Sequence, residues 1–420
     1  MSLKQATRSS ALAAVDSGEQ PIGMMHSMHV YAGFRLLMLG TLATNTAFWM
    51  YQVAVGWLAL EMTDSPFFVG LAGFTGGIPL LILSLPAGVM VDRIDRRKIL
   101  LIAQTGVMIL AGIFAVSVGV DILHPWSMLV LVAAYGSVMS FIFPTRTAIV
   151  ASLVDRAHLG NAIALNAATQ NATRVVGPSL AGVLIALIGA SGTFAIAAIL
   201  QLFALYTSHK LPSTPTDASA HKGMSWQSLT AGFRVVAKSP VLTALIMLAL
   251  APTILVMPYI NLMPVFARDQ LDLGSTGLGV LLASVGLGTV VGSLAVARSQ
   301  KLRSMPGAQL VTATIFTILV LFFSITPMAA VAAVLLFVAG AASSAYLAIN
   351  QTQLQLNVED EVRGRVLSVY LLTWGMLPLG QLFVGTLANV TSTPTAMVVS
   401  CSISVMCIGI IARRYPSLRS

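Results

Sequence analysis

The sequence predicts an all-α integral membrane protein in which twelve transmembrane helices form two pseudo-symmetric six-helix bundles. Three observations support this fold class. Most of the chain lies in long apolar runs, nearly all positive charges fall on one predicted side of a membrane, and the second half weakly repeats the first.

The composition excludes a soluble protein. Hydrophobic residues make up 57% of the chain, charged residues only 9%, and the mean hydropathy is +0.88. A soluble domain carries roughly 25% charged residues, so this chain has too few to cover a water-facing surface. Because a helix needs about 20 residues to cross the hydrocarbon core, we expect spans at residues 35–60, 67–91, 99–120, 127–151, 161–188, 192–209, 240–266, 274–297, 308–325, 328–350, 364–388 and 393–412.

The positive charge is distributed as in an inner-membrane protein. The net charge is +9, which by itself could indicate a nucleic-acid partner. With the N-terminus inside, however, all 23 Lys and Arg residues fall on the cytoplasmic side except Arg174, inside a span, and Arg268, outside. This positive-inside bias places both termini in the cytoplasm and makes nucleic acid an unnecessary hypothesis.

Residues 210–238 form the only long internal hydrophilic stretch. The first half, rich in Pro, Ser and Thr, is typical of a flexible linker. In the second half Trp226, Leu229, Phe233 and Val236 recur at helical spacing, which predicts a short interfacial helix. We therefore expect a cytoplasmic tail at 1–34, a six-helix bundle at 35–209, a linker at 210–238, a second bundle at 239–412 and a tail at 413–420.

The two halves repeat each other at a fixed offset. The segment VDRAHLG at 154–160, after the fourth span, matches VEDEVRG at 358–364, after the tenth. The same offset of 204 residues relates Gly88 to Gly292 and Arg97 to Lys301. Such a duplication predicts two like bundles that face each other, with a substrate site between them near the middle of the membrane.

The loop between the second and third spans combines a glycine, two acids and four basic residues: Gly88, Asp92, Arg93, Asp95, Arg96, Arg97 and Lys98. A glycine at a span end allows close helix approach, and an acid is stabilised beside a helix N-terminus. The segment resembles the Major Facilitator Superfamily signature G-x-x-x-D-R-x-G-R-R-K, with Asp95 where that family usually has glycine.

That resemblance implies that Asp92, Arg93 and Arg97 form ion pairs that close a cytoplasmic gate in one conformation. Arg146 and Asp155, at the cytoplasmic end of the fourth span, are plausible partners. The alternative is a positive-inside loop without a special role.

A Gly177-Pro178 pair lies inside the fifth span, where proline removes a backbone hydrogen bond and kinks a helix. Small residues at Gly177, Ala181 and Gly182 allow close packing. The segment resembles the family's antiporter motif G-x-x-x-G-P-x-x-G-G, which implies an exporter, although Thr173 and Ala181 replace two of its glycines. The alternative is an ordinary packing kink.

Arg174 is predicted to be the only formal charge inside a hydrocarbon core, roughly 18 Å from the cytoplasmic end of its helix. An arginine there costs at least about 2.5–3.5 kcal/mol unless it faces a wet cavity or a partner. We favour a cavity role over a structural contact between helices. Other residues that could line this cavity, or form ordinary interhelical hydrogen bonds, are Asn45, Trp49, Gln52, Gln170, Asn261, Tyr346, Trp374 and Gln381.

Other kinds of site are not indicated. All 14 acidic residues lie in loops or at span ends, so no buried acid stands out as a proton carrier. Cys401 and Cys407 face different directions on the last span, so they indicate neither a disulfide nor a metal site. Met24, Met25, His26, Met28 and His29 are possible soft-metal ligands, but we favour a mobile tail. We expect no metal, no cofactor and no enzymatic activity.

The chain as a whole is similar to the enterobactin-exporter and macrolide-efflux branch of the superfamily. The stretches that carry this are 56–66, the Asp92 loop, 161–178 and 361–366. The resemblance implies a monomeric exporter of drugs or siderophores that works by alternating access, with protons as the possible coupling ion. An importer or uniporter on the same fold, a lipid translocator and a non-transporting membrane protein remain alternatives.

Overall fold

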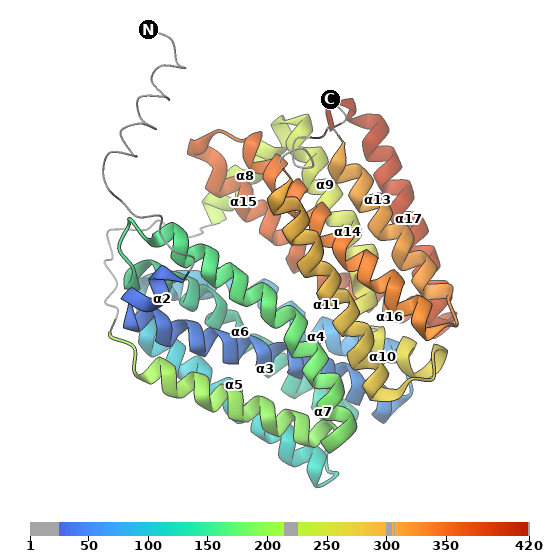
Figure 1. Cartoon of the computed structure of the whole chain (residues 1–420), viewed down its shortest axis with the longest axis horizontal. Helices are drawn as coiled ribbons and strands as arrows, with labels where there is room; N and C mark the ends of the chain where they lie inside the picture. The colour runs from blue at the N-terminus through green and yellow to red at the C-terminus, as the bar shows by residue number, and fades with distance from the viewer. Residues whose placement is uncertain (1–24, 214–225, 300–304, 306, 419–420) are drawn as a thin grey trace.

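The computed structural model describes residues 25–213, 226–299, 305 and 307–418, which form helices joined by short loops (Figure 1). The N-terminal half contains α2 (His26–Val30), α3 (Ala32–Thr63), α4 (Pro66–Arg93), α5 (Arg96–Gly119), α6 (Pro125–Leu153) and α7 (Leu159–His209). The C-terminal half contains α8 (Trp226–Lys238), α9 (Pro240–Leu255), η1 (Met257–Ile260), α10 (Met263–Val265), η2 (Phe266–Gln270), α11 (Gly274–Arg298), α13 (Ala308–Ile325), α14 (Ala329–Leu356), α15 (Asp360–Gly375), α16 (Leu377–Val390), α17 (Thr393–Arg414) and η3 (Pro416–Leu418).

Ten segments of the described chain are long and apolar enough to cross a membrane. One of them, α7, consists of two helices that meet at Gly189, whose positive φ of 72° favours glycine. A further helix, α3, has 32 residues and is not among these ten; its Thr41, Thr44 and Asn45 side chains are buried. Together these segments supply the twelve predicted spans, so the predicted fold class is confirmed.

The two halves form separate helical groups. In Figure 1 the blue-to-green half occupies the lower left and the yellow-to-red half the upper right. We call the side where α3 begins and α17 ends the terminal face, and the side that carries Asp64 and Arg268 the far face. Helix α3 packs along α7 within the first group, and α11 packs along α14 within the second.

Glycines bring the groups into backbone contact toward the far face. Helix α4 packs on α16 and α7 packs on α11. A Cβ atom on Gly70 would come within 3.0 Å of the Gly385 Cα, and one on Gly279 within 3.2 Å of the Gly182 Cα. Near the terminal face, by contrast, a Cβ on Gly88 or Gly364 would meet nothing within 4 Å.

Two spans of the C-terminal half are broken. The seventh passes from α9 through η1 and α10 into a π-helical turn, with prolines at Pro252, Pro258 and Pro264. The eleventh is interrupted at Gly375 and Met376, between α15 and α16. The breaks are adjacent, because a Cβ on Gly380 would collide with the backbone of Ile254.

The predicted interfacial helix is present as α8, and it packs on α15. Its Val236 is buried while Phe233 is exposed; the side chains of Trp226 and Leu229, and the linker residues 214–225, lie outside the description.

The first helix of the described chain begins nearer the N-terminus than expected, inside the predicted tail. In α2, the Ser27 hydroxyl donates to the Asn161 side chain at 2.7 Å. The stretch from His26 to Val30 is therefore docked on α7 rather than a free tail. No cluster of metal-ligating side chains occurs among the residues the structure describes.

Replacing Gly279 by valine should destabilise the contact between α7 and α11, because the new side chain would press on the Gly182 backbone. Overpacking of this kind costs about 1–3 kcal/mol. We expect the apparent melting temperature of the purified protein to fall by a few degrees. Gly409→Val on α17 is the matched control, since a Cβ there meets nothing within 4 Å; equal losses in both variants would contradict the prediction.

Candidate functional site

The guanidinium group of Arg174 lies between the two helical groups. Its central carbon is 5.6 Å from the ring centroid of Trp49, on α3. It is also 5.6 Å from the ring centroid of Trp374, on α15. Both distances are within the range of a cation–π interaction. Because one indole belongs to each half, Arg174 faces the space between the halves and not the lipid.

The three residues of this sandwich share one depth. Trp49, Arg174 and Trp374 each lie close to the midpoint of their spanning segments, which are Ala32–Thr63, 159–189 and 360–390. Arg174 is exposed, and Gln170, one turn closer to the terminal face on α7, is half-buried. The structure therefore brings together Trp49, Arg174 and Trp374 from the predicted cavity set, while Gln170 lies one turn away on the same helix as Arg174.

A pair of amides lies beside the two helix breaks. Both the Asn261 Nδ2 and the Gln381 Oε1 atoms would be 2.5 Å from a Cβ on Gly73. Gln381 is buried, and its Oε1 atom accepts no hydrogen bond in the described part of the chain. Asn261 and Gln381 thus face α4 across the interface between the halves, and their role in a cavity stays a prediction.

The remaining cavity candidates differ in their surroundings. Asn45 and Gln52 lie on α3 on either side of Trp49; Asn45 is buried and Gln52 half-buried. Tyr346 lies in the core of the C-terminal half, where its hydroxyl donates to the Leu248 carbonyl at 2.8 Å. Tyr346 therefore holds α14 to α9 and does not reach the space between the halves.

Arg146 belongs to a polar network inside the N-terminal half that the sequence did not indicate. Its guanidinium donates to the hydroxyls of Thr41 at 3.1 Å and Thr44 at 2.9 Å, and to the Gln104 Oε1 atom at 3.2 Å. Gln104 in turn donates to Gln201. Arg146 is only 4% exposed, so Arg174 is not the sole charge within the spans, contrary to expectation.

The basic loop at the terminal face is engaged mainly with backbone groups. Arg96 donates to the Ala148 carbonyl at 3.3 Å, and Arg97 donates to the His209 carbonyl. The Asp95 carboxylate accepts from the Arg97 backbone N–H at 2.8 Å and so caps α5. This explains why an acid can replace the usual glycine.

The expected partners of the Asp92 loop are occupied elsewhere. Asp155 accepts a hydrogen bond of 2.7 Å from the Tyr31 hydroxyl, and Arg146 is bound inside the first half. The side chain of Asp92 lies outside the description. The gating roles of Gly88, Arg93 and Lys98 remain predictions.

At the far face, polar contacts join the two halves. Arg268 forms ion pairs with Asp64, across the interface, and with Asp269 at 2.5 Å. The Ser65 hydroxyl donates to the Asn389 side chain at 3.0 Å.

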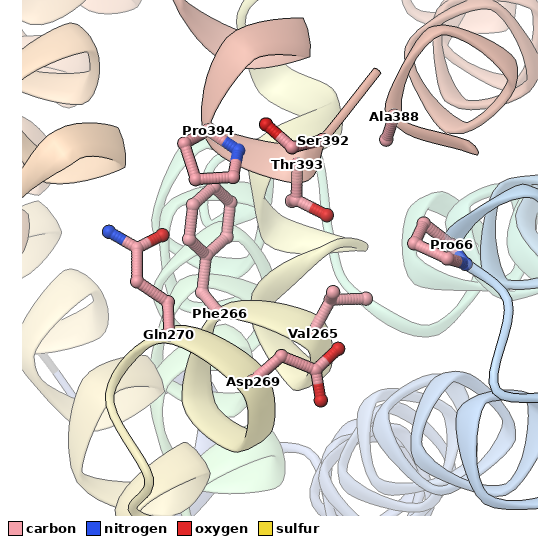
Figure 2. Close-up of a pocket in the computed structure, with 9 residues that line it drawn as sticks. All are labelled: Pro66, Val265, Phe266, Asp269, Gln270, Ala388, Ser392, Thr393 and Pro394. Atoms are coloured by element: carbon pink, nitrogen blue, oxygen red, sulfur yellow. The ribbon is translucent and has the colours of Figure 1, made fainter. Parts of the chain in front are cut away.

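A cavity of about 340 Å³ opens beside these contacts. Figure 2 shows that Pro66, from α4, faces a wall built by the C-terminal half. That wall consists of Val265, Phe266, Asp269, Gln270, Ala388, Ser392, Thr393 and Pro394. The cavity is at the level where α4 begins and α16 ends, so it is separate from the Arg174 sandwich.

Residues 28–419 match the family described as transmembrane secretion effector, within the Major Facilitator type. The chain belongs to this family. It is 25% identical to the staphyloferrin A transporter of Staphylococcus aureus, over 81% of this chain and 86% of that protein. It is 25% identical to the multidrug efflux pump Tap of Mycolicibacterium fortuitum, over 91% and 96%. It is 27% identical to the enterobactin exporter EntS of Shigella flexneri, over 81% and 80%.

Solved structures agree with the fold. A bacterial homolog of the human lysosomal transporter Spinster, in an inward-facing and unoccupied conformation, superposes with a TM-score of 0.74 at 15% identity, covering 92% of this chain and 98% of that one. The nucleoside transporter NupG gives a TM-score of 0.70 at 13% identity, covering 91% of this chain and 99% of that one. The chain is therefore a multi-pass membrane transporter and not an enzyme.

The Asp64–Arg268 pair should hold the far face closed only weakly, because the Asp64 and Arg268 side chains are 83% and 30% exposed. Exposed pairs contribute about 0.2–1 kcal/mol. Asp64→Asn should therefore change the population in which the two halves touch at the far face by at most about fivefold. Electron spin-resonance distances between labels at Ile122 and Val390, in a cysteine-free background, would measure this shift.

The charge-swapped double variant, with Asp64→Arg and Arg268→Asp, should restore the original distance distribution. A complete loss of the closed state in Asp64→Asn would show that the pair, and not helix packing, holds the far face together.

Proposed function

We propose that this protein exports small amphipathic molecules, of the drug or siderophore class, across the inner membrane by alternating access. The observation that carries the proposal is the Arg174 sandwich: a cation and two aromatic rings, contributed by both halves, at the midpoint of the spans. The relatives named above are exporters or transporters of siderophores and drugs.

The terminal face is proposed to be cytoplasmic, because the positive charges lie there. With that orientation, the described conformation is closed toward the outside, where glycines bring the halves into backbone contact. We infer that it is open toward the cytoplasm, and the support is that a Cβ on Gly88 or Gly364 would meet nothing within 4 Å. A substrate would thus reach Arg174 from the cytoplasm, past Gln170.

Release to the outside requires the opposite arrangement. The contacts at Gly70 and Gly279 and the Asp64–Arg268 pair would open, and the Asp92 loop would close against the other half. The Asp92 and Arg97 positions are proposed as gate residues on this basis. The segment at Gly177 and Pro178 resembles the antiporter motif of exporters, and this resemblance supports export as the direction. Gly177 also packs against Trp49 and so lies beside the Arg174 sandwich.

Protons are proposed as the coupling ion. The support is the antiporter-like motif, and the carrier has yet to be assigned, because acidic residues of the spanning helices occur only in their end turns. Neither the Asp92 loop nor the surroundings of Arg174 supply a described carboxylate within the membrane interior.

Cells that express the protein should accumulate less of a fluorescent amphiphile than cells without it. Because the export step would draw on the proton gradient, a protonophore should raise accumulation to the control level. Whole-cell fluorescence over time measures both effects. Higher accumulation on expression would instead indicate an importer. Unchanged accumulation for every amphiphile tested would favour lipid translocation or a non-transporting protein.

Asp92→Lys should abolish transport while leaving membrane insertion intact, because the reversed charge would prevent the proposed gate from closing. Export of the same fluorescent amphiphile, together with the amount of protein in the membrane fraction, provides the measurement. Asp217→Lys, in the predicted linker, is the matched control and should transport normally. Full activity of Asp92→Lys would rule out the gating role.

A further inference from the structure

The two arginines that lie within the spans have opposite environments. Arg146 is buried, and its guanidinium donates to Thr41, Thr44 and Gln104. Arg174 is exposed between the halves. In the described chain its guanidinium takes part in no hydrogen bond or ion pair, and its partners are the faces of Trp49 and Trp374. Both Nη groups of Arg146 are therefore hydrogen-bonded within the fold, whereas the donors of Arg174 are available to a ligand.

Among the described residues, no ion pair links a carboxylate to Arg174. The described ion pairs are at the far face, around Arg268. On α7 itself there is no acidic residue between Leu159 and His209. A membrane-interior arginine without a protein counter-charge marks a pathway for a charged solute. The missing counter-charge must then come from the solute.

We propose that the exported substrate is an organic anion that carries a carboxylate or a comparable acidic group on a flat apolar body. This deepens the function proposed above and rests on it. The planar guanidinium of Arg174 can donate two parallel N–H bonds to a carboxylate. The indoles of Trp49 and Trp374 provide flat faces for the apolar part.

Such a substrate would also act on the contact between the halves. Arg174, on α7, bridges Trp49 of its own half and Trp374 of the other half. An anion bound to the N–H edge of the guanidinium partly neutralises the charge that the indole faces attract. Binding would therefore weaken the link from Arg174 to Trp374 and free the two halves to move relative to each other.

The charge of the substrate also bears on the driving force. A cell interior that is electrically negative favours the outward movement of an anion. Protons that enter in exchange move charge in the same direction. The membrane potential therefore assists this export even though no acid lies in the middle of the described spans.

Equilibrium binding of three probes of matched shape tests the proposal: 1-naphthoate, neutral 1-naphthamide and cationic 1-naphthylmethylammonium. The full-length protein is held in nanodiscs of phosphatidylcholine. We expect naphthoate to bind at least about tenfold more tightly than naphthamide, the range of a charge-assisted hydrogen bond, and the cation to bind most weakly. Quenching of tryptophan fluorescence and equilibrium dialysis give the dissociation constants.

Arg174→Gln should remove the preference for naphthoate, while Arg174→Lys should retain part of it. Arg413→Gln, which removes an exposed positive charge at the end of α17, is the matched control and should bind as the parent does. Thermal unfolding of each variant confirms that it is folded. Equal binding of naphthoate and naphthamide to the parent, or an unchanged preference in Arg174→Gln, would overturn the proposal.

Two further outcomes separate this inference from the proposed export. If cells export amphiphiles but anions have no advantage that depends on Arg174, the anion proposal fails and export stands. If the charge preference holds but no amphiphile leaves the cell, export fails and the anion site stands. Loss of naphthoate binding in nanodiscs that contain phosphatidylglycerol would assign the anion to a lipid headgroup and overturn a small-molecule substrate.

Discussion

Close backbone contact between the two halves is the constraint on which the rest of the structure depends. Within a bilayer the hydrophobic effect does not drive helices together, so association relies on close packing of small residues. Here Gly70 with Gly385 and Gly182 with Gly279 provide that packing, and all four lie on the far-face side of the molecule. These two contacts lie on one side of Arg174, which is the side that the proposed export cycle would have to open.

The two broken spans lie where the contact between the halves approaches the Arg174 sandwich. The interruption at Gly375 follows Trp374 directly, and the irregular seventh span brings Asn261 toward Gln381 and Gly73. Irregular backbone at membrane depth is tolerated where it is covered by protein or lines a cavity. The corresponding helices of the first half, α3 and the first part of α7, are continuous. The two helix breaks therefore lie in the C-terminal half, whereas Arg174 lies in the N-terminal half.

Sequence alone predicted the spans and the central arginine, because both follow from hydropathy and from the cost of a buried charge. It did not predict the breaks in the seventh and eleventh spans, since apolar runs such as 240–266 continue through them. The sequence also did not show which way the Arg146 side chain points. That residue can face a loop or the bundle interior, and only the assembled positions of Thr41, Thr44 and Gln104 decide between them.

The ion pair at the far face has a consequence for the history of the duplicated chain. Asp64 and Arg268 are 204 residues apart, which is the offset that relates Gly88 to Gly292 and Arg97 to Lys301. The two charges thus occupy equivalent positions in the two repeats. Two identical ancestral halves would have carried the same residue at both places and could not have formed this pair. The attraction therefore depends on a difference between the two repeats, an acid in the first and a base in the second.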